Sequence, residues 1–354
     1  MPPDDIAVVT YRGALVENTH RAHIVVTTES GSLLLGSGDP LRLTLPRSAA
    51  KPAQALAVLA TGAFERFELS DEDLALMCGS HSSEPRHIER TRDMLRKVGR
   101  AEADLQCGGH PPLSDAVASD WIRQGFAPTA VCSNCSGKHV GMLAGAQALG
   151  ATTAGYHLPD HPMQARVREA TAQLGGLPID AVHWATDGCN LPTPAFPLSR
   201  LAQSFAQLAH AADQACNPQR TPAQADAARV YHAMTAHPEW VGGEGRFCTR
   251  LMQAFGGALV GKVGADGCYG VGVRASPQTR RLGAPGALGI AVKVEDGNVG
   301  VLYMLVCELL ERLQLGTPAQ RQALEAFHRP PMRNTAGLST GHADFVFDLQ
   351  PGAA

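Results

Sequence analysis

The chain has 354 residues, of which 44% are hydrophobic but only 5% aromatic, and its formal net charge is −3. This length and hydrophobic content predict a sizeable, mainly aliphatic core in one large domain or two small ones. Because the sequence has no long basic or acidic block, it argues against nucleic acid or a membrane surface as a partner.

Both ends of the chain have the pattern of β-strands, and the middle has the pattern of helices. The sequence after residue 330 is too irregular to indicate any element. Strands are predicted at residues 6–11, 23–28, 32–36, 41–45, 258–263, 268–273 and 289–294. Helices are predicted at residues 84–98, 137–149, 162–174, 197–212, 299–313 and 318–327.

This order of elements predicts an α+β fold, with an antiparallel sheet built from both chain ends and a mainly helical middle region. The sheet is expected from about residues 6–46 and 257–295, and the helical region from about residues 52–250. No linker or internal repeat interrupts the chain, so residues 1–354 are predicted to form a single domain.

The sequence predicts a cytoplasmic protein that does not enter a membrane. Its first five residues lack the basic and apolar parts of a secretion signal. The longest apolar run, residues 299–310, is interrupted by Glu308 and is too short to span a bilayer, so a buried helix is expected there. Nine cysteines, an odd number, predict reduced thiols or metal ligands rather than a disulfide framework.

The first stretch with clear chemical potential is PRSAAKP, residues 46–52, between a strand-like run and an apolar helical run. Ser48 is expected at or near a helix N-cap, where serine is favoured. Lys51 lies three residues further on and therefore shares its helix face. A desolvated lysine can take the proton of a serine hydroxyl and so make it a nucleophile. The alternative is a capping serine beside a solvated lysine.

A second stretch, far downstream, strengthens the catalytic interpretation. Lys262 begins the sequence KVG, residues 262–264, within a glycine-rich, strand-like run. Serine acyl-enzymes of the β-lactamase type combine S-x-x-K with a K-T-G strand. Their middle S-D-N element is missing here in that form, because Ser114 and Asp115 are followed by Ala116.

Cysteines carry the third stretch, CSNCSGKH at residues 132–139. Its C-x-x-C spacing could place two thiolates on one zinc ion, or it could be a redox pair, although no βαβ context surrounds it. A phosphate loop is excluded, because Cys132 stands where the first glycine should fall and His139 follows the lysine. The remaining alternative is two small hydrophobic residues before a helix. Cys189, in a tight loop, is a further candidate thiolate.

Taken in order, these stretches resemble one family. The sequence resembles the L-asparaginase II family of the Rhizobium etli type, the inducible thermolabile class, over about residues 6–316. The motifs that carry the resemblance are PRSAAKP (46–52), GSHS (79–82), CGGH (107–110), CSGKH (135–139), DGC (187–189), HPE (237–239), GRF (245–247) and KVGADG (262–267).

The resemblance implies a serine β-lactamase-like fold, a homodimer and a single catalytic domain. The implied reaction is hydrolysis of L-asparagine to L-aspartate and ammonia. Residue by residue, the resemblance maps Ser48 with Lys51 onto the nucleophile and its base. It maps Ser80 with Lys262 onto a second serine–lysine pair. Covalent hydrolysis of an amide needs such activated groups, and two pairs can relay the protons.

The resemblance also implies a Zn²⁺ cofactor. Cys135, Lys138 and Cys189 map onto a zinc site that is unusual for its lysine ligand. Cys132 is not carried over, although the bare C-x-x-C spacing would have chosen it.

Three further residues map onto the substrate-binding site: Arg47 and His139 in the pocket, and Asp187 beside the zinc through water. Other functions stay open at this point. One is a zinc-dependent amidohydrolase of another small amide, in which a metal-activated water attacks. Another is a non-catalytic, zinc-containing protein that binds asparagine. A β-lactam hydrolase is a weaker alternative, because the S-D-N element is absent.

Overall fold

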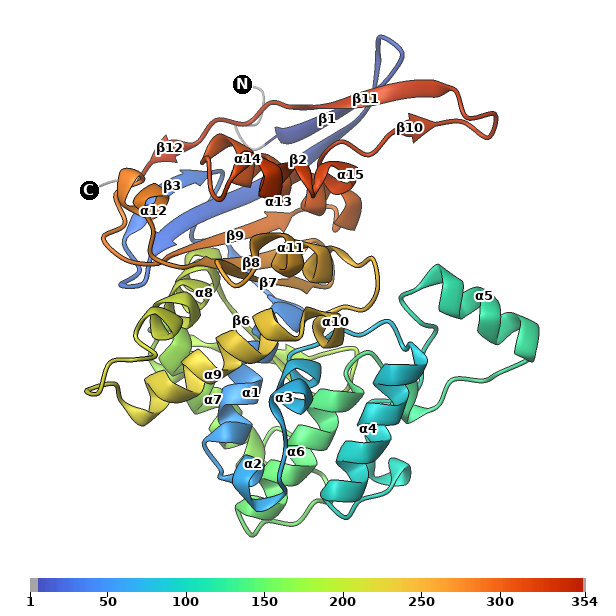
Figure 1. Cartoon of the computed structure of the whole chain (residues 1–354), viewed down its shortest axis with the longest axis vertical. Helices are drawn as coiled ribbons and strands as arrows, with labels where there is room; N and C mark the ends of the chain where they lie inside the picture. The colour runs from blue at the N-terminus through green and yellow to red at the C-terminus, as the bar shows by residue number, and fades with distance from the viewer. Residues whose placement is uncertain (1–5, 353–354) are drawn as a thin grey trace. The chain divides into compact units, whose positions relative to one another are not determined.

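The structure is a computed structural model that describes residues 6–352. It mixes helices with antiparallel strands, which confirms the α+β class (Figure 1). The chain forms two compact units. Unit 1 contains the described parts of Met1–Ala49, Phe196–Asp213 and Arg250–Ala354, and unit 2 contains Ala50–Ala195 and Gln214–Thr249. That the whole chain acts as one catalytic domain stays a prediction.

Unit 1 is organised around a nine-stranded sheet to which both ends of the chain contribute. Its central path runs in the order β10-β11-β1-β2-β9-β8-β7, while β3 pairs with β2 and β12. All of these pairs are antiparallel. The bounds are β1 (Ile6–Arg12), β2 (Leu15–Thr28), β3 (Leu33–Ser37), β7 (Leu259–Gly264), β8 (Cys268–Val273), β9 (Leu288–Val294), β10 (Met332–Arg333), β11 (Ser339–Phe345) and β12 (Gln350–Pro351).

The extent of this sheet corrects the sequence prediction. The segment after residue 330, which gave no clear pattern, supplies β10, β11 and β12, so the sheet is not limited to residues 6–46 and 257–295. These strands were missed because they are short or half-exposed and carry few apolar residues. The strand expected at residues 41–45 shrinks to β4 (Leu43–Thr44), and the helix expected at 318–327 divides into two short helices.

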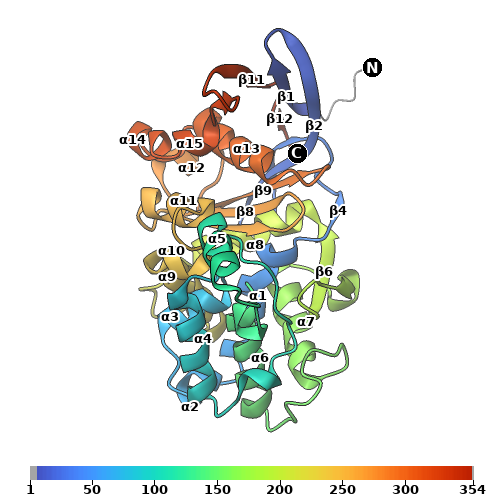
Figure 2. The ribbon, with the colours of Figure 1, turned by 90° about the vertical axis from the view of Figure 1, so that its right-hand side faces the viewer.

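Buried strands and close helix packing form the core of unit 1. Every residue of β7, β8 and β9 is buried, which explains their continuous apolar sequence. Helix α8 (Leu198–Asp213) packs on one face of these strands and α13 (Val299–Arg312) on the other (Figure 2). Gly270 lets α8 approach closely, because a Cβ there would lie 2.2 Å from the Phe205 ring.

The apolar run at residues 299–310 forms most of α13, as the sequence predicts, and most of this helix is buried. Across residues 6–352, no helix combines the length and the apolar character that a membrane span requires. The other helices assigned wholly to unit 1 are α12 (Pro277–Arg281), α14 (Pro318–Gln322) and α15 (Glu325–His328).

Unit 2 is mainly helical. The predictions of helices at residues 84–98, 137–149 and 162–174 are confirmed to within two residues at each end. Its helices are α1 (Lys51–Leu59), α2 (Ala63–Arg66), α3 (Asp71–Met77), α4 (Pro85–Lys97), α5 (Asp115–Gln124), α6 (Ser136–Ala148), α7 (Pro162–Gly175), α9 (Pro222–Ala236) and α10 (Pro238–Val241). The remaining elements of the chain are β5 (His183–Thr186), β6 (Pro192–Pro197) and α11 (Phe247–Phe255).

Helix α6 is the central element of unit 2, buried from Ser136 to Ala146. Glycines at every fourth position explain how its neighbours come so close. A Cβ at Gly141 would lie 2.3 Å from a Met77 side-chain carbon of α3, and one at Gly145 would lie 2.4 Å from the Met163 sulfur of α7. The small-residue face of α6 therefore permits packing in which both methionine side chains would have to move to admit a larger residue.

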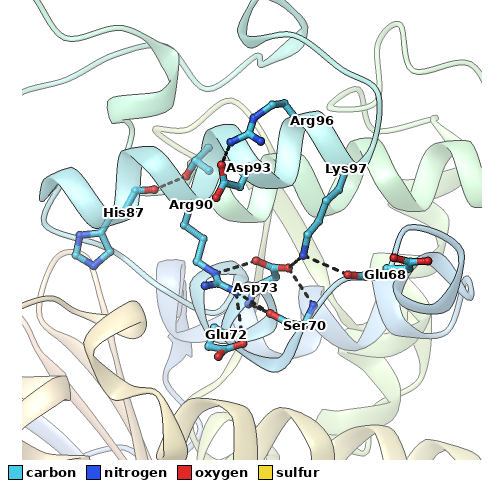
Figure 3. A network of polar contacts seen from close by, with 10 residues as sticks. Glu68, Ser70, Glu72, Asp73, His87, Arg90, Asp93, Arg96 and Lys97 are labelled. Atoms are coloured by element: carbon cyan, nitrogen blue, oxygen red, sulfur yellow. Dashed lines mark hydrogen bonds and ion pairs between the residues drawn. The ribbon is translucent and has the colours of Figure 1, made fainter.

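A buried carboxylate joins α3 to α4 (Figure 3). Asp73 is 1% exposed, and its oxygens accept hydrogen bonds from Arg90 Nε and Lys97 Nζ, each at 2.8 Å. The carboxylate also accepts from the backbone N–H of Ser70 at 2.9 Å, which closes a capping box at the start of α3. This network ties the first turn of α3 to α4.

We predict that Asp73→Ala lowers the free energy of unfolding by about 3 kcal/mol, because two cations and one N–H lose a buried partner. The matched control is Asp93→Ala. Asp93 pairs with Arg96 on the same helix face, but both side chains are more than half exposed, so a change within about 0.5 kcal/mol is expected. Urea denaturation of both variants measures the difference. Equal effects would show that the Asp73 network contributes nothing beyond a surface pair.

Candidate active site

Ser48 lies in a single 3₁₀ turn, η1 (Arg47–Ala50), that runs directly into α1. The N-cap of α1 is Ala50, so Ser48 lies near the helix N-cap, as predicted, but is not the capping residue itself. The turn begins earlier than expected, because Arg47 adopts a left-handed conformation (φ 50°) and Ala49 N–H donates to the carbonyl of Pro46. Ser48 is half-buried inside this turn.

Within unit 1, strand β7 lies against the segment that carries Ser48. A Cβ at Gly264 would lie 2.0 Å from the Pro46 carbonyl oxygen and 3.3 Å from Ala49 N, so only glycine allows this approach. Lys262 lies two residues earlier on the same strand. Its side chain is fully buried, and its Nζ donates to the carbonyl of Val263 at 2.6 Å. The KVG sequence is thus a neighbour of the PRSAAKP turn.

Arg47 forms an ion pair within unit 1, where its Nη1 lies 2.5 Å from Asp266 Oδ2. Asp266 is at the β7–β8 turn, with a φ of 58° and a side chain that is 71% exposed. The predicted substrate-binding arginine therefore already has an exposed carboxylate as its partner. A substrate carboxylate could replace that partner and pair with the guanidinium bidentately.

In unit 2, Lys51 lies beside Ser80. The lysine is fully buried, and its Nζ donates to Ser80 Oγ at 3.1 Å. The same Nζ also hydrogen-bonds to the carbonyl oxygens of Gly79 and Asn134, so this buried nitrogen has three acceptors around it. The sequence predicted Lys51 as the partner of Ser48 and Lys262 as the partner of Ser80. The structure adds that Lys51 contacts Ser80.

The loop that holds Ser80 follows α3 and is fixed at almost every residue. Ser80 N–H donates to the carbonyl of Val241 at 2.8 Å, and Ser83, with a φ of 58°, donates through its hydroxyl to Cys132 O at 2.7 Å. A Cβ at Gly79 would lie 2.5 Å from the Trp240 carbonyl oxygen. The glycine of the GSHS motif is therefore required by close packing.

His81 is a buried residue of this loop to which the sequence gave no role. Its Nδ1 accepts from Ser83 N–H at 3.1 Å, and its Nε2 donates to Ser136 Oγ at 2.9 Å. Burial and the nearby His87 and Lys51 charges hold the pKa of His81 well below its usual range, so the ring is neutral. His81 thereby connects the Ser80 loop with the first turn of α6. The GSHS motif contained this residue, but its partners are distant in sequence.

The three predicted zinc ligands lie together in unit 2. Lys138 Nζ is 3.1 Å from Cys189 Sγ. Cys135 interacts with Cys189 as well as with Asn134, whose Oδ1 lies 3.0 Å from the Cys135 Sγ. All three side chains are buried. Cys135 and Lys138 come from the start of α6, while Cys189 comes from the β5–β6 loop. Asp187 lies in the same loop, with its Oδ2 3.6 Å from Cys189 Sγ.

The charges in this cluster are strongly coupled. The hydrogen bond from Cys135 and the charge of Lys138 lower the pKa of Cys189 to about 5, against the effect of burial. The same hydrogen bond and burial raise the pKa of Cys135 to about 12. For Lys138, burial lowers the pKa, but the Cys189 thiolate outweighs it and the net direction is upward. The result is a buried thiolate–ammonium pair with a neutral thiol beside it.

Cys132, the other half of the C-x-x-C, has different surroundings. Its Sγ is 4.0 Å from Thr129 Oγ1, and its carbonyl accepts from Ser83. Among residues 6–352, no group of three or more His, Cys, Asp or Glu side chains is arranged to hold a metal. The predicted set uses two cysteines and a lysine instead. Two thiols and an amine in buried contact are donors that zinc accepts once they lose their protons.

His139, predicted to line the substrate pocket, lies on α6 next to Lys138. It is fully buried, and its Nδ1 is 2.7 Å from the hydroxyl of Tyr156. Burial, reinforced by the charge of Lys138, lowers the pKa of His139 to about 3. Tyr156 is also fully buried and was not selected from the sequence, because nothing in its local sequence distinguishes it from a core tyrosine.

Comparison with known proteins gives one family and several distant structures. The chain is similar to the crystal structure of Mglu in its native form in 4.3 M NaCl, at 16% identity and a TM-score of 0.44, over 83% of this chain and 61% of that one. For Mglu in its tris and glutamate form, the values are 16%, 0.44, 88% and 63%. The chain thus spans less than two thirds of these two Mglu chains. No curated protein matches it.

The family comparison covers far more of the chain. The family model of L-asparaginase II matches residues 8–345. This range contains both serine–lysine stretches, the cysteine cluster and the sheet strands from β7 to β11. The chain therefore belongs to the L-asparaginase II family.

Proposed function

We propose that this protein is an L-asparaginase, which hydrolyses L-asparagine to L-aspartate and ammonia. One observation carries the proposal beyond family membership. Lys51 is fully buried, its Nζ lies 3.1 Å from Ser80 Oγ, and it follows Ser48 on one continuous segment. A buried lysine beside a serine hydroxyl is the arrangement that activates serine in covalent amide hydrolysis.

The proposed mechanism has two halves. Ser48 Oγ attacks the side-chain amide carbon of asparagine, and the neutral amine of Lys51 takes the serine proton, with the Ser80 hydroxyl in the relay. That proton passes to the leaving nitrogen, and ammonia departs as the acyl-enzyme forms. Water then attacks the ester, gives a proton to the same relay, and releases aspartate with a free serine. The role of Lys262 as partner of Ser80 belongs to the same proposal.

We also propose one Zn²⁺ per chain, held by Cys135, Lys138 and Cys189. When bound, the ion would supply positive charge and a fixed anchor near the substrate. Because the chain has a serine–lysine pair for nucleophilic attack, we expect zinc to tune substrate binding. The Rhizobium etli type, the β-lactamase-like fold, the homodimer and the cytoplasmic location that the resemblance implies are part of this proposal as well.

We predict that Cys135→Ala and Cys189→Ala lose zinc, while Cys132→Ala keeps it. The reason is that Lys138 and Cys135 contact Cys189, whereas Cys132 lies beside Thr129. Metal content of the purified variants, measured by mass spectrometry, checks this. Equal loss in Cys132→Ala would mean that the C-x-x-C pair holds the ion.

The affinity for zinc should also rise steeply with pH. Cys135 and Lys138 are both protonated near neutral pH, since their pKa values are raised, and each must lose its proton to bind metal. Cys189, with a pKa of about 5, is already a thiolate there and adds no further dependence. The dissociation constant should therefore fall by up to about 100-fold per pH unit, tenfold for each proton released. Competition with a chelator across neutral pH measures the slope.

An ammonia-release assay on asparagine, glutamine and a β-lactam tests the proposed function directly. Turnover of asparagine supports it, and turnover by the pure protein excludes a non-catalytic binding protein. The main rival is a zinc-dependent amidohydrolase, in which metal-activated water is the nucleophile. If activity disappears on complete metal removal while the fold is retained, the rival is favoured. Activity that survives removal excludes it.

A further inference from the structure

One nitrogen of the buried His139 ring has no hydrogen-bond partner. Nδ1 lies 2.7 Å from the Tyr156 hydroxyl, but Nε2 is buried and unpartnered among the described residues. The ring is 0% exposed, so bulk water does not satisfy this atom. Buried polar atoms in proteins are rarely left without a partner, so Nε2 marks a place where a ligand atom or an ordered water binds.

The hydrogen bonds of Tyr156 decide whether His139 Nε2 donates to or accepts from that ligand atom. A phenol has one proton to donate and lone pairs to accept with. The Tyr156 hydroxyl accepts from the backbone N–H of Gln106 at 2.9 Å. Within residues 6–352, the one acceptor within reach of its proton is His139 Nδ1. The tyrosine proton therefore goes to Nδ1, and the imidazole proton is on Nε2.

His139 Nε2 carries a proton both in this neutral tautomer and in a doubly protonated ring. If the imidazole carried two protons, Nδ1 would donate to the phenol oxygen and the tyrosine proton would lose its acceptor, but Nε2 would still be an N–H donor. The remaining tautomer, with the proton on Nδ1 alone, would leave the buried Tyr156 proton without an acceptor. Nε2 is thus a donor in every satisfied arrangement.

We propose that Tyr156 is a positioning residue that fixes His139 with its Nε2–H aimed at an oxygen of the bound substrate. Among the groups of an amino-acid substrate, the partner must be a carbonyl or carboxylate oxygen, because neither a protonated amino group nor a metal ion can accept a hydrogen bond. His139 is therefore excluded as a zinc ligand through Nε2, although it adjoins Lys138. The identity of the substrate rests on the proposed function, whereas the tautomer does not.

The tautomer can be read directly by NMR. Two-bond ¹H–¹⁵N correlation spectra of histidine-labelled protein distinguish an Nε2–H ring from an Nδ1–H ring, and His139→Gln identifies the signal among 14 histidines. We expect the Nε2–H pattern in the wild type and its loss or mixing in Tyr156→Phe. An Nδ1–H pattern in the wild type would overturn the inference, whatever the enzyme hydrolyses.

L-Aspartate, the proposed product, is used to test whether a bound ligand contacts His139 Nε2. Saturating L-aspartate, with binding verified by calorimetry, should shift the His139 Nε2 signal. A signal that does not move would mean that Nε2 serves only a buried water, and the substrate contact would be refuted. If aspartate fails to bind at all, the proposed function fails, while the tautomer spectrum still decides the role of Tyr156.

Kinetics separate positioning from simple structural support. Tyr156→Phe should raise KM for asparagine about tenfold and leave kcat within about twofold, because one oriented hydrogen bond is lost. The matched control is Gln164→Leu. Gln164 Nε2 donates to the Tyr156 backbone carbonyl at 2.8 Å, so this variant loosens the tyrosine but keeps its hydroxyl. The same rise in KM in both variants, with an unchanged His139 tautomer, would reduce Tyr156 to a packing residue.

Discussion

Replacing Ser48 by alanine is expected to lower kcat/KM for L-asparagine by about 10⁴-fold or more, with little change in stability. Loss of a covalent nucleophile removes nearly all turnover in enzymes of this kind. Ser48 is half-buried in the η1 turn, and alanine fits a 3₁₀ turn as well as serine does. Thermal unfolding followed beside the activity assay separates a catalytic loss from a folding defect.

The same substitution identifies the acylated serine. Enzyme quenched during turnover and digested should give an acyl adduct on the peptide that contains Ser48, and Ser48→Ala should give none. Ser80→Ala should slow turnover but keep the adduct on Ser48. An adduct on Ser80 would reverse the roles, and the 3.1 Å contact between Lys51 and Ser80 makes this a real alternative.

Lys51 is a less suitable target for this experiment. Its Nζ also hydrogen-bonds to the carbonyls of Gly79 and Asn134, so its removal leaves buried acceptors unsatisfied. A defect in Lys51→Met would therefore combine lost catalysis with lost stability.

The second large effect concerns substrate choice. We expect kcat/KM for asparagine to exceed that for glutamine by more than about 100-fold. One methylene in an apolar pocket is worth only about 1–3 kcal/mol. A covalent mechanism discriminates further, because the reacting carbon must lie within roughly 3–3.5 Å of Ser48 Oγ while the amino-acid end is held. A wild-type ratio near one would replace the asparaginase assignment with a general amidase.

Arg47 is the proposed group that holds the α-carboxylate, and its ion pair with Asp266 makes the test sharp. Arg47→Ala should lower kcat/KM for asparagine about 100-fold and reduce the preference over glutamine, since it removes a charge-assisted pair. Asp266→Asn is the matched control. It removes the partner of Arg47 but keeps the arginine, and Asp266 is exposed, so stability should change little. If both variants lose activity equally, the Arg47–Asp266 ion pair is required for activity, and the proposed role of Arg47 in holding the α-carboxylate is not supported.

Local signals in the sequence predicted much of the fold. Glycine and proline at the ends of apolar periodic segments located α4, α6 and α7, and continuous apolar runs located β7, β8 and β9. Strands β10, β11 and β12 were not predicted, because short or half-exposed strands with few apolar residues have no strong sequence pattern. The start of the η1 turn was not predicted for another reason. It depends on the left-handed conformation of Arg47, in a segment that packs against β7, and local sequence does not indicate this contact.

The candidate site was likewise predicted only in part from the sequence. Residue types and spacing selected Ser48, Lys51 and the cysteines, because these chemistries need particular atoms. Partners could not be predicted, since they depend on tertiary contacts. Nothing in the sequence indicates that Lys51 would lie at Ser80, or that Cys135 would hydrogen-bond to Cys189. Tyr156 was missed because its function depends on one distant hydrogen bond to His139.

The discontinuous make-up of unit 1 has a consequence during synthesis. Strand β2 pairs with β9, with Ala22 opposite Val294, and β1 pairs with β11. At about 5–20 residues per second, the ribosome needs on the order of 15–50 s after β2 emerges before β9 follows. Unit 2, by contrast, comes mostly from the continuous stretch Ala50–Ala195. Its helices can collapse while the ribosome is still working. Strand β2 can pair early with β1 and β3, but its edge toward β9 stays open, and therefore prone to aggregation, until the end of synthesis.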